Sequence, residues 1–347
     1  MATGRIYNEI FLEHGETWHV ENRARLEAIL ARLQGNGLWD ELEELDTYPA
    51  EQDQLLWLHD DDYLEELQAI SNSGGAALDM DTVANWATWG AATVAAGSCM
   101  SAVEDMIEGG VDNALCLVRP PGHHALPSRA MGFCFLNNAA LAAEFALHHD
   151  LERVAIVDWD VHHGNGTQDM FYHRGDVFYT SIHELELFPA TGTVDEVGVD
   201  AGAGRNVNIP LPRGAQGRHY LRALDEVIIP ALQQYKPELL VVSAGYDGHH
   251  TDPVAHHELT TDAYHEITAR MVTLAQELCE GRLCVILEGG YAPEALAHGV
   301  ENTALAMLGR PVLEAERDQV EVHPEATARV DEYLEGAIAV HRERLGL

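Results

Sequence analysis

The sequence is that of a long and strongly acidic chain. It has 347 residues, of which 46% are hydrophobic and 22% charged, and its 57 Asp and Glu against 20 Lys and Arg give a formal net charge of −37. The apolar fraction excludes a disordered chain, and the negative charge argues against binding to nucleic acid or to an anionic membrane surface.

Cysteine and lysine usage points to a cytoplasmic protein. The five cysteines lie in apolar contexts with no Cys-x-x-Cys pair, and the start of the chain is charged where a signal peptide would be apolar. We therefore expect reduced core cysteines and a cytoplasmic location. The only lysine is Lys236, and dispersed acid with almost no lysine resembles proteins adapted to a salt-saturated cytoplasm.

In chain order, helical patterns give way to alternating strands and helices. Residues 1–70 are acidic and helical, and the uncharged stretch Thr82–Val103 predicts a buried helix with Asp81 or Thr82 as its N-cap. The predicted strands are Ala114–Val118, Val154–Val157, Val177–Ser181, Leu239–Ala244 and Leu283–Leu287, and the predicted helices are Asn137–His149, Tyr220–Gln234 and Asp262–Cys279. This alternation predicts a single α/β domain over 1–347, with a central, mostly parallel sheet covered by helices on both faces and a peripheral helical segment at 311–347.

Polar residues that can bind a cation follow two of these strands. Asp158, Asp160 and His162 have the i, i+2, i+4 spacing that puts side chains on one face of an extended segment, so two of them can bind a metal while the third supports them. Asp247 follows another strand, and clustered acids at one sheet edge are costly unless a cation neutralises them. The alternative is a solvated acidic strand end. Two carboxylates and one imidazole suit zinc, or Fe²⁺, Mn²⁺ or Co²⁺, with an open position.

A rigidly presented histidine pair follows the first of these strands. His123-His124 comes after Pro-Pro-Gly, and its expected partners are Asp158 for His123 and Asn165 for His124. A carboxylate raises the pKa of an imidazole and an amide leaves it lower, so we expect His124 to act as a base and His123 as a standing positive charge. The other pairs, interpreted as surface or loop features, are His148-His149, His249-His250 and His256-His257.

Three aromatic residues are candidates for the same site. Tyr291 follows Glu-Gly-Gly at the end of the last predicted strand, where its hydroxyl can stabilise an oxyanion. Phe133 and Phe188 lie near the expected site. For each of the three the alternative is a core aromatic residue.

Together these motifs resemble the histone deacetylase superfamily, which includes acetylpolyamine amidohydrolases and acetoin-utilisation proteins. The resemblance spans about residues 15–310, and Asn165 is similar to the class II branch, since the class I branch usually has Asp there. The motifs that carry the resemblance are R-P-P-G-H-H-A (119–125), G-F-C-F-L-N-N (132–138), D-W-D-V-H-H-G-N-G-T-Q (158–168), S-A-G-Y-D (243–247) and L-E-G-G-Y (287–291).

The resemblance implies an arginase-like fold and zinc-dependent removal of acetyl groups from N-acetylated amines. It implies zinc bound by Asp160, His162 and Asp247. The other implied residues are His124 as general base and acid, His123 as its electrostatic partner with Asp158 and Asn165 in support, Tyr291 as the polariser of the acetyl carbonyl, and Phe133, Phe188, Gly132 and Val254 along the substrate channel.

The resemblance also implies bound potassium. A structural site would use Asp158, Asp160, His162, Ser181 and the Ile182 carbonyl. A second site would map near Phe171 and Val177, where Arg174 falls among the backbone donors and Arg205 replaces a usual aromatic residue.

One residue beside the predicted site bears on the substrate. Polyamine-selective relatives of the class II branch carry Glu after an Asp-Pro pair, and here Asp252-Pro253 is followed by Val254. We therefore expect acetyl-lysine in proteins as the substrate, although an acidic surface attracts polycations. Asp81 could hold a substrate backbone at the rim, but an N-cap is its expected role. The alternatives are an acetylpolyamine or small-amide hydrolase, a weakly active acyl-lysine binding protein, and a two-metal ureohydrolase.

Overall fold

The fold is built on one central sheet. A computed structural model describes residues 2–312, 318–320 and 323–347. Eight strands form the sheet in the order β2-β1-β5-β10-β9-β6-β7-β8, and every neighbouring pair is parallel. The strands are β1 (Thr3–Ile6), β2 (Glu43–Glu44), β5 (Asn113–Cys116), β6 (Val154–Asp158), β7 (Val177–Glu184), β8 (Asn206–Leu211), β9 (Leu239–Ala244) and β10 (Leu283–Leu287), and β3 (Gly75–Ala77) pairs antiparallel with β4 (Val83–Asn85) outside the sheet.

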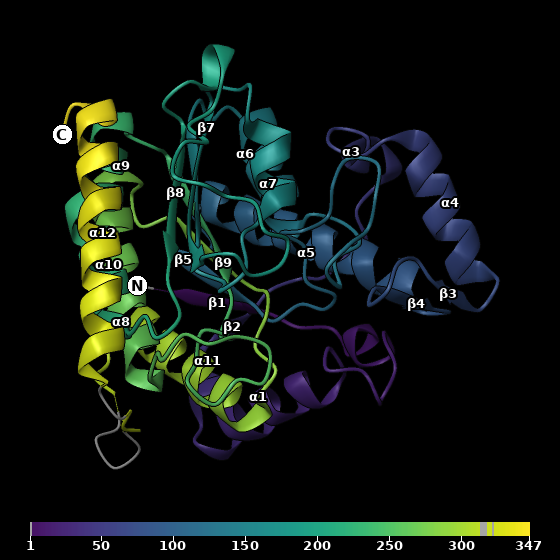
Figure 1. The fold of residues 1–347 in the computed structure, drawn as a ribbon. Coiled ribbons are helices and arrows are strands. Elements are labelled where there is room, and N and C mark those ends of the chain that lie inside the picture. The colour runs from purple at the N-terminus through teal and green to yellow at the C-terminus, as the bar shows by residue number, and fades with distance from the viewer. Residues whose placement is uncertain (1, 313–317, 321–322) are drawn as a thin grey trace.

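Helices cover both faces of the sheet (Figure 1). Those on one side include α5 and α6, and those on the other include α10. The helices are α1 (Ala24–Gly35), α2 (Leu38–Glu41), α3 (Gln52–Leu55), α4 (Asp61–Asn72), α5 (Thr88–Glu108), α6 (Asn138–His148), α7 (Asn165–Phe171), α8 (Gly217–Ala223), α9 (Ile229–Tyr235), α10 (Thr261–Leu278), α11 (Pro293–Met307) and α12 (Pro324–Leu345), and a π-helical turn at Leu224–Ile228 joins α8 to α9. The α/β class, the single domain and the parallel sheet are as predicted.

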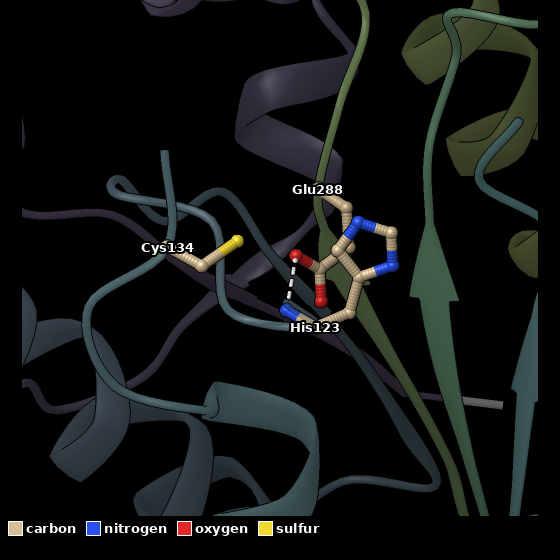
Figure 2. Close-up of side chains that lie close together, drawn as sticks. All are labelled: His123, Cys134 and Glu288. Carbon is tan, nitrogen blue, oxygen red and sulfur yellow. Dashed lines mark hydrogen bonds between the residues drawn. The ribbon is translucent and has the colours of Figure 1, made fainter. Parts of the chain in front are cut away.

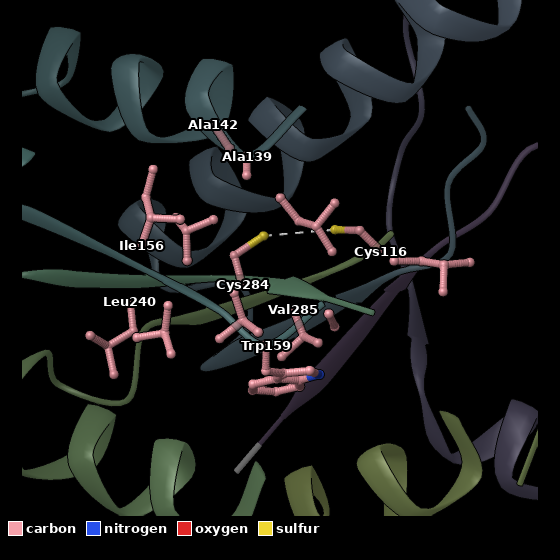
Figure 3. Packing of buried hydrophobic residues seen from close by; sticks show 14 of the residues in the cluster. Cys116, Ala139, Ala142, Ile156, Trp159, Leu240, Cys284 and Val285 are labelled. Carbon is pink, nitrogen blue, oxygen red and sulfur yellow. Dashed lines mark hydrogen bonds between the residues drawn. The ribbon is translucent and has the colours of Figure 1, made fainter. Parts of the chain in front are cut away.

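Apolar side chains fill the space between the sheet and its helices. Every residue of the central strands β9, β6 and β10 is buried, which explains their continuous apolar sequences. Figure 3 shows Cys116 and Cys284 from adjacent strands in this core, with their sulfur atoms 3.7 Å apart. All five cysteines are free and buried.

The prediction missed two strands of ordinary length because polar side chains interrupt their apolar pattern. In β1, the guanidinium of Arg5 lies 4.0 Å from the ring centroid of Trp39 and binds Glu44, so a charged residue fits within the sheet. In β8, the amide groups of Asn206 and Asn208 donate to Gln168 Oε1.

The long helix predicted from the uncharged stretch begins later than expected and continues into charged residues, since α5 spans Thr88–Glu108. Asp81 and Thr82 are not its N-cap, because α5 begins at Thr88 and residues 83–85 form β4. The backbone N–H groups of Asp81 and Thr82 instead donate to Asp79 Oδ1 in a turn before that strand. At the true start of the helix, Asn85 Oδ1 accepts from Ala87 N at 3.0 Å.

The C-terminal helix covers the edge of the sheet. In the predicted peripheral segment, residues 313–317 and 321–322 lie outside the described residues, and α12 packs beside the edge strand β8 (Figure 1). His341 Nε2 lies 2.7 Å from the Asn208 carbonyl oxygen, so the helix occupies a backbone acceptor that an edge strand would otherwise expose. Among the described residues, no helix has both the length and the apolar character needed to span a bilayer.

Candidate metal centre and active site

The polar segments meet because their strands are neighbours. Strands β5, β10, β9 and β6 lie side by side in the sheet and run in the same direction. Their carboxyl ends therefore bring the His123-His124, Tyr291, Asp247 and Asp158–His162 segments to one edge.

Asp160, His162 and Asp247 converge at this edge. His162 Nδ1 lies 3.1 Å from Asp160 Oδ1 and 3.0 Å from Asp247 Oδ2, and one ligand atom from each residue lies within 4.8 Å of the others. Asp158, the last residue of β6, is not part of this trio but lies beside it, because its Oδ1 accepts from Asp160 N at 3.1 Å and its Oδ2 faces His123.

The local backbone fits a cation held by these three side chains. Backbone N–H groups orient both carboxylates: Val161 N donates to Asp247 at 3.1 Å, and Gly289 N donates to Asp160 Oδ2 at 2.8 Å. A Cβ at position 289 would lie 2.2 Å from Asp247 Oδ2, so only glycine permits this approach. Two buried carboxylates and an imidazole form a donor set that suits zinc and related divalent ions.

A narrow pocket of about 210 Å³ leads to this trio. This volume is below the usual range for drug-sized ligands and suits a slender chain. Its walls carry the predicted channel residues as well as Asp81, and the lining residues are Asp81, His124, Gly132, Phe133, His162, Phe188, Val254 and Tyr291.

The two histidines of the pair have different partners. His123 Nδ1 lies 3.0 Å from Asp158 Oδ2, and His124 Nδ1 lies 2.8 Å from Asn165 Oδ1. Burial lowers the pKa of His123, but the charges of Asp158 and Asp160 outweigh it and raise that pKa to about 10. Burial, together with the neighbouring charge of His123, holds the pKa of His124 well below its usual range. The opposite pKa shifts favour a charged imidazole at His123 beside a neutral imidazole at His124.

Tyr291 is fixed from several sides at the pocket wall. The Asp252 carboxylate accepts its backbone N–H at 2.6 Å, and the Phe133 ring lies edge-on to its ring at 5.7 Å between centroids. The guanidinium of Arg25 lies 5.0 Å from the same ring centroid. Burial raises the pKa of the phenol well above its usual value, so the hydroxyl stays a proton donor.

Another part of the pocket wall is formed at a strained turn. Gly132 and Phe133 both have positive φ angles, of 55° and 68°. A Cβ at position 132 would lie 2.4 Å from the His124 ring, so glycine is required for this close approach. Phe133 carries the strain of a left-handed backbone to place its ring in the pocket.

Comparisons with known proteins show the family to which the chain belongs. The sequence model of the histone deacetylase domain matches residues 19–307. The chain belongs to the histone deacetylase family. It is similar to a probable deacetylase of Archaeoglobus fulgidus, with 38% identity over 89% of this chain and 87% of the relative, and to a histone deacetylase-like amidohydrolase of Pseudomonas aeruginosa, with 39% identity over 79% and 73%. The crystal structure of the HDA15 HD domain superposes with a TM-score of 0.88 at 32% identity, covering 100% of this chain and 98% of that domain.

Sequence reasoning missed a buried charge network beside the candidate active site of this histone deacetylase family member. Glu21 accepts from Arg25 and Arg119, and all three side chains are almost fully buried. Arg25 also donates to the backbone carbonyls of Glu288 and Gly290, in the loop that precedes Tyr291. The network therefore joins the tyrosine loop to Arg119, which begins the segment leading to the histidine pair.

Removing Glu21 is expected to destabilise the fold strongly. Glu21→Ala leaves two buried guanidinium groups without their shared carboxylate, so the free energy of unfolding should fall by about 3–5 kcal/mol. Chemical denaturation measures this change. Glu27→Ala removes only the partner of the exposed Arg23 and serves as the control, with a much smaller effect. An equal loss of unfolding free energy in the two variants would show that the buried network does not stabilise the fold.

Glu288 is a second buried acid, after Glu21, for which the sequence analysis predicted no role. Figure 2 shows its carboxylate against the backbone of His123, with the Cys134 sulfur facing the same space. Glu288 Oε2 accepts from Gly122 N at 2.7 Å and His123 N at 3.2 Å, while Oε1 accepts from Ser243 at 3.0 Å. Burial raises its pKa to about 7. Because donors from the protein bind both carboxylate oxygens, we interpret Glu288 as a residue that holds the backbone of Gly122 and His123 in place.

Two of the predicted potassium residues, Asp160 and His162, belong to the metal trio, and a third, Asp158, accepts from Asp160 N at 3.1 Å. Asp158 and Ser181 are register partners on adjacent strands, and Ile182 follows Ser181. At the predicted second site, Arg174 lies over the Phe171 ring and pairs with Asp176 and Glu144. Arg205 lies over the ring of Tyr235.

The other histidine pairs lie on the surface or in loops, as predicted, but two of these histidines are buried, which was not predicted. His148 and His149 are exposed, as predicted. In contrast, His249 and His257 are buried loop residues. His257 Nδ1 lies 2.8 Å from the Tyr220 hydroxyl, and the His249 ring contacts Asp318.

Proposed function

We propose that the chain is a zinc-dependent deacetylase that hydrolyses acetyl-lysine side chains in proteins. The observation that carries this proposal is the placement of His124 and Tyr291 on the walls of the pocket that reaches His162. Family membership supports an amidohydrolase, and the pocket supports an acyl-amide substrate with a slender stem.

Asp160, His162 and Asp247 would hold the catalytic cation. When bound there, a divalent ion supplies Lewis-acid polarisation and lowers the pKa of a water molecule. Their two carboxylates neutralise the charge of such an ion, so protein donors must supply part of the stabilisation of the transition state.

Protein groups in the pocket account for the proton movements. His124, held by Asn165, takes a proton from the attacking water and returns one to the departing amine. His123 stays protonated beside Asp158 and stabilises negative charge that develops nearby. The Tyr291 hydroxyl donates to the carbonyl oxygen as it gains charge. The amide C–N bond breaks, and the products are acetate and the free amine.

The pocket walls support an aliphatic stem on the substrate. Phe133 and Phe188 line the passage, and Phe188 is 40% exposed at its mouth. Gly132 lets the wall lie against His124. A lysine side chain presents four methylene groups to such walls before its acetylated nitrogen reaches the active site.

Val254 supports the preference for acetyl-lysine over an acetylated polyamine. It lies in the wall of the pocket, where its aliphatic side chain offers no charge to a second amine. Val254→Glu is expected to raise kcat/KM for N-acetylputrescine relative to an acetyl-lysine peptide about tenfold, because a carboxylate there can pair with a cationic amine. Steady-state kinetics on both substrates measures the ratio, with Val254→Gln as the uncharged control. An equal ratio in the two variants would show that the charge does not select the substrate.

The proposed substrate is tested by direct comparison. The wild-type chain is assayed with an acetyl-lysine peptide and with N-acetylputrescine, at high KCl with added Zn²⁺. We expect the larger kcat/KM with the peptide. A larger kcat/KM for N-acetylputrescine would indicate a polyamine deacetylase that uses the same residues. If neither substrate released acetate, the proposed deacetylation would be wrong.

We also propose a structural potassium ion held by Asp158, Asp160, His162, Ser181 and the carbonyl of Ile182. The adjacency of Asp158 and Ser181 across two strands supports it. A second potassium ion near Phe171 and Val177 stays a prediction from the resemblance.

A further inference from the structure

A second group of metal-ligating side chains lies away from the pocket walls. His249 and His250, in the loop after β9, meet Asp318, which lies beyond the last residue matched by the family's sequence model. His249 Nε2 lies 2.6 Å and His250 Nε2 3.2 Å from the same carboxylate atom, Asp318 Oδ2.

This convergence resembles that of the catalytic trio. In both groups, one potential ligand atom from each of three residues lies within 4.8 Å of the other two. Two imidazoles and one carboxylate suit Zn²⁺ and neighbouring divalent ions, with further positions left for water.

Neighbouring residues orient these potential ligands. Thr261 donates to Asp318 Oδ1 from both its backbone N and its Oγ1, each at 2.9 Å, which leaves Oδ2 facing the two imidazoles. His249 Nδ1 lies 2.9 Å from Thr251 Oγ1. This hydroxyl oxygen can accept a hydrogen bond from Nδ1–H when Nε2 binds a metal. The Thr251 N–H also points at Nδ1 at 3.2 Å, and metal binding would release this contact.

The cluster is accessible to an ion from solution. The His249 side chain is only 4% exposed, whereas His250 and Asp318 are each 24% exposed. One imidazole is therefore held inside the protein while the other two ligands border solvent, so water can complete the coordination shell.

We propose that His249, His250 and Asp318 form a second, structural site for zinc or a similar divalent ion. His249 is only two residues from Asp247, so the site would join residue 318 to the loop that carries a predicted catalytic ligand. Its role would be to fix that loop. Without a cation, the same arrangement is a hydrogen-bonded pair of imidazoles on one carboxylate, and metal binding distinguishes the two.

Zinc stoichiometry tests this proposal on the full chain with no affinity tag. Metal-stripped protein is titrated with Zn²⁺ alone. We expect about two bound ions per wild-type chain and about one in His250→Ala and in Asp318→Asn. His148→Ala, in an exposed histidine pair, is the matched control and should keep the wild-type number. One bound ion in the wild type and no loss in His250→Ala would overturn the proposal.

A stability measurement separates this site from the catalytic one. Asp160→Ala should still bind about one ion, and Zn²⁺ should raise its Tm because the ion binds the folded chain. The double variant Asp160→Ala, His250→Ala should show neither the bound ion nor the rise in Tm. A rise in Tm with Zn²⁺ in the double variant would contradict the proposed site. If the wild type binds a single ion that His250→Ala removes and Asp160→Ala keeps, the structural site stands and the catalytic zinc proposal fails.

Discussion

Replacing Tyr291 by phenylalanine is expected to lower kcat on an acetyl-lysine peptide about 10²–10³-fold, the usual cost of losing an oxyanion donor. The change removes one oxygen atom and leaves the ring in contact with Phe133 and Arg25. Because the hydroxyl acts on charge that appears in the transition state, KM should change much less than kcat.

The control for this prediction is Tyr333→Phe, which removes a hydroxyl from a partly exposed ring on α12. It should leave kcat at the wild-type value. A Tyr291→Phe chain that is folded by circular dichroism and turns over at the wild-type rate would show that the phenol has no catalytic role.

Replacing His124 by glutamine is expected to lower kcat about 10²–10⁴-fold, because an amide cannot take and return a proton. Glutamine is similar in length and can still bond to Asn165, so the turn that carries the pair should persist. Single-turnover assays on the acetyl-lysine peptide separate this chemical step from product release.

His173→Gln is the matched control, since His173 is an exposed residue whose ring bonds to Asp200. It should retain full activity. A His124→Gln chain within about tenfold of wild type would move the proton transfer to another group, and His123 would be the first to examine.

The edge of the sheet that carries the candidate active site could be predicted because the information for it is local in the sequence. Continuous apolar runs identified β9 and β10 with their correct bounds, and the residues directly after them are Gly-Tyr-Asp and Glu-Gly-Gly-Tyr. Parallel strands then place such segments at one edge without knowledge of side-chain contacts. Asp158 and Asn165 were expected as the partners of His123 and His124, and the structure brings each pair into contact.

The supporting network could not be predicted because its members lie far apart in the sequence. Glu21 and Arg119 are 98 residues apart, and Arg25 reaches a carbonyl 265 residues away. Arg119 could have indicated the network, because it follows a strand that was predicted to be buried, and a buried charge needs a partner of opposite charge. Glu288 offered the same signal.

The burial of two loop histidines was not predicted, for a related reason. The sequence around His249 and His257 has no apolar periodicity, so nothing in it indicated burial. Each is buried through a specific long-range partner, Asp318 or Tyr220. Adaptation to high salt stays a prediction from the net charge of −37.

The most direct test of the proposed function is the metal dependence of acetate release from an acetyl-lysine peptide. The wild-type chain should lose activity after chelation and regain it with Zn²⁺, whereas Asp247→Asn should stay inactive in both states. His250→Ala should also regain activity with Zn²⁺, because the ion proposed at His249, His250 and Asp318 takes no direct part in catalysis. Full activity after complete metal removal, or an active Asp247→Asn chain, would contradict a catalytic cation held by Asp160, His162 and Asp247.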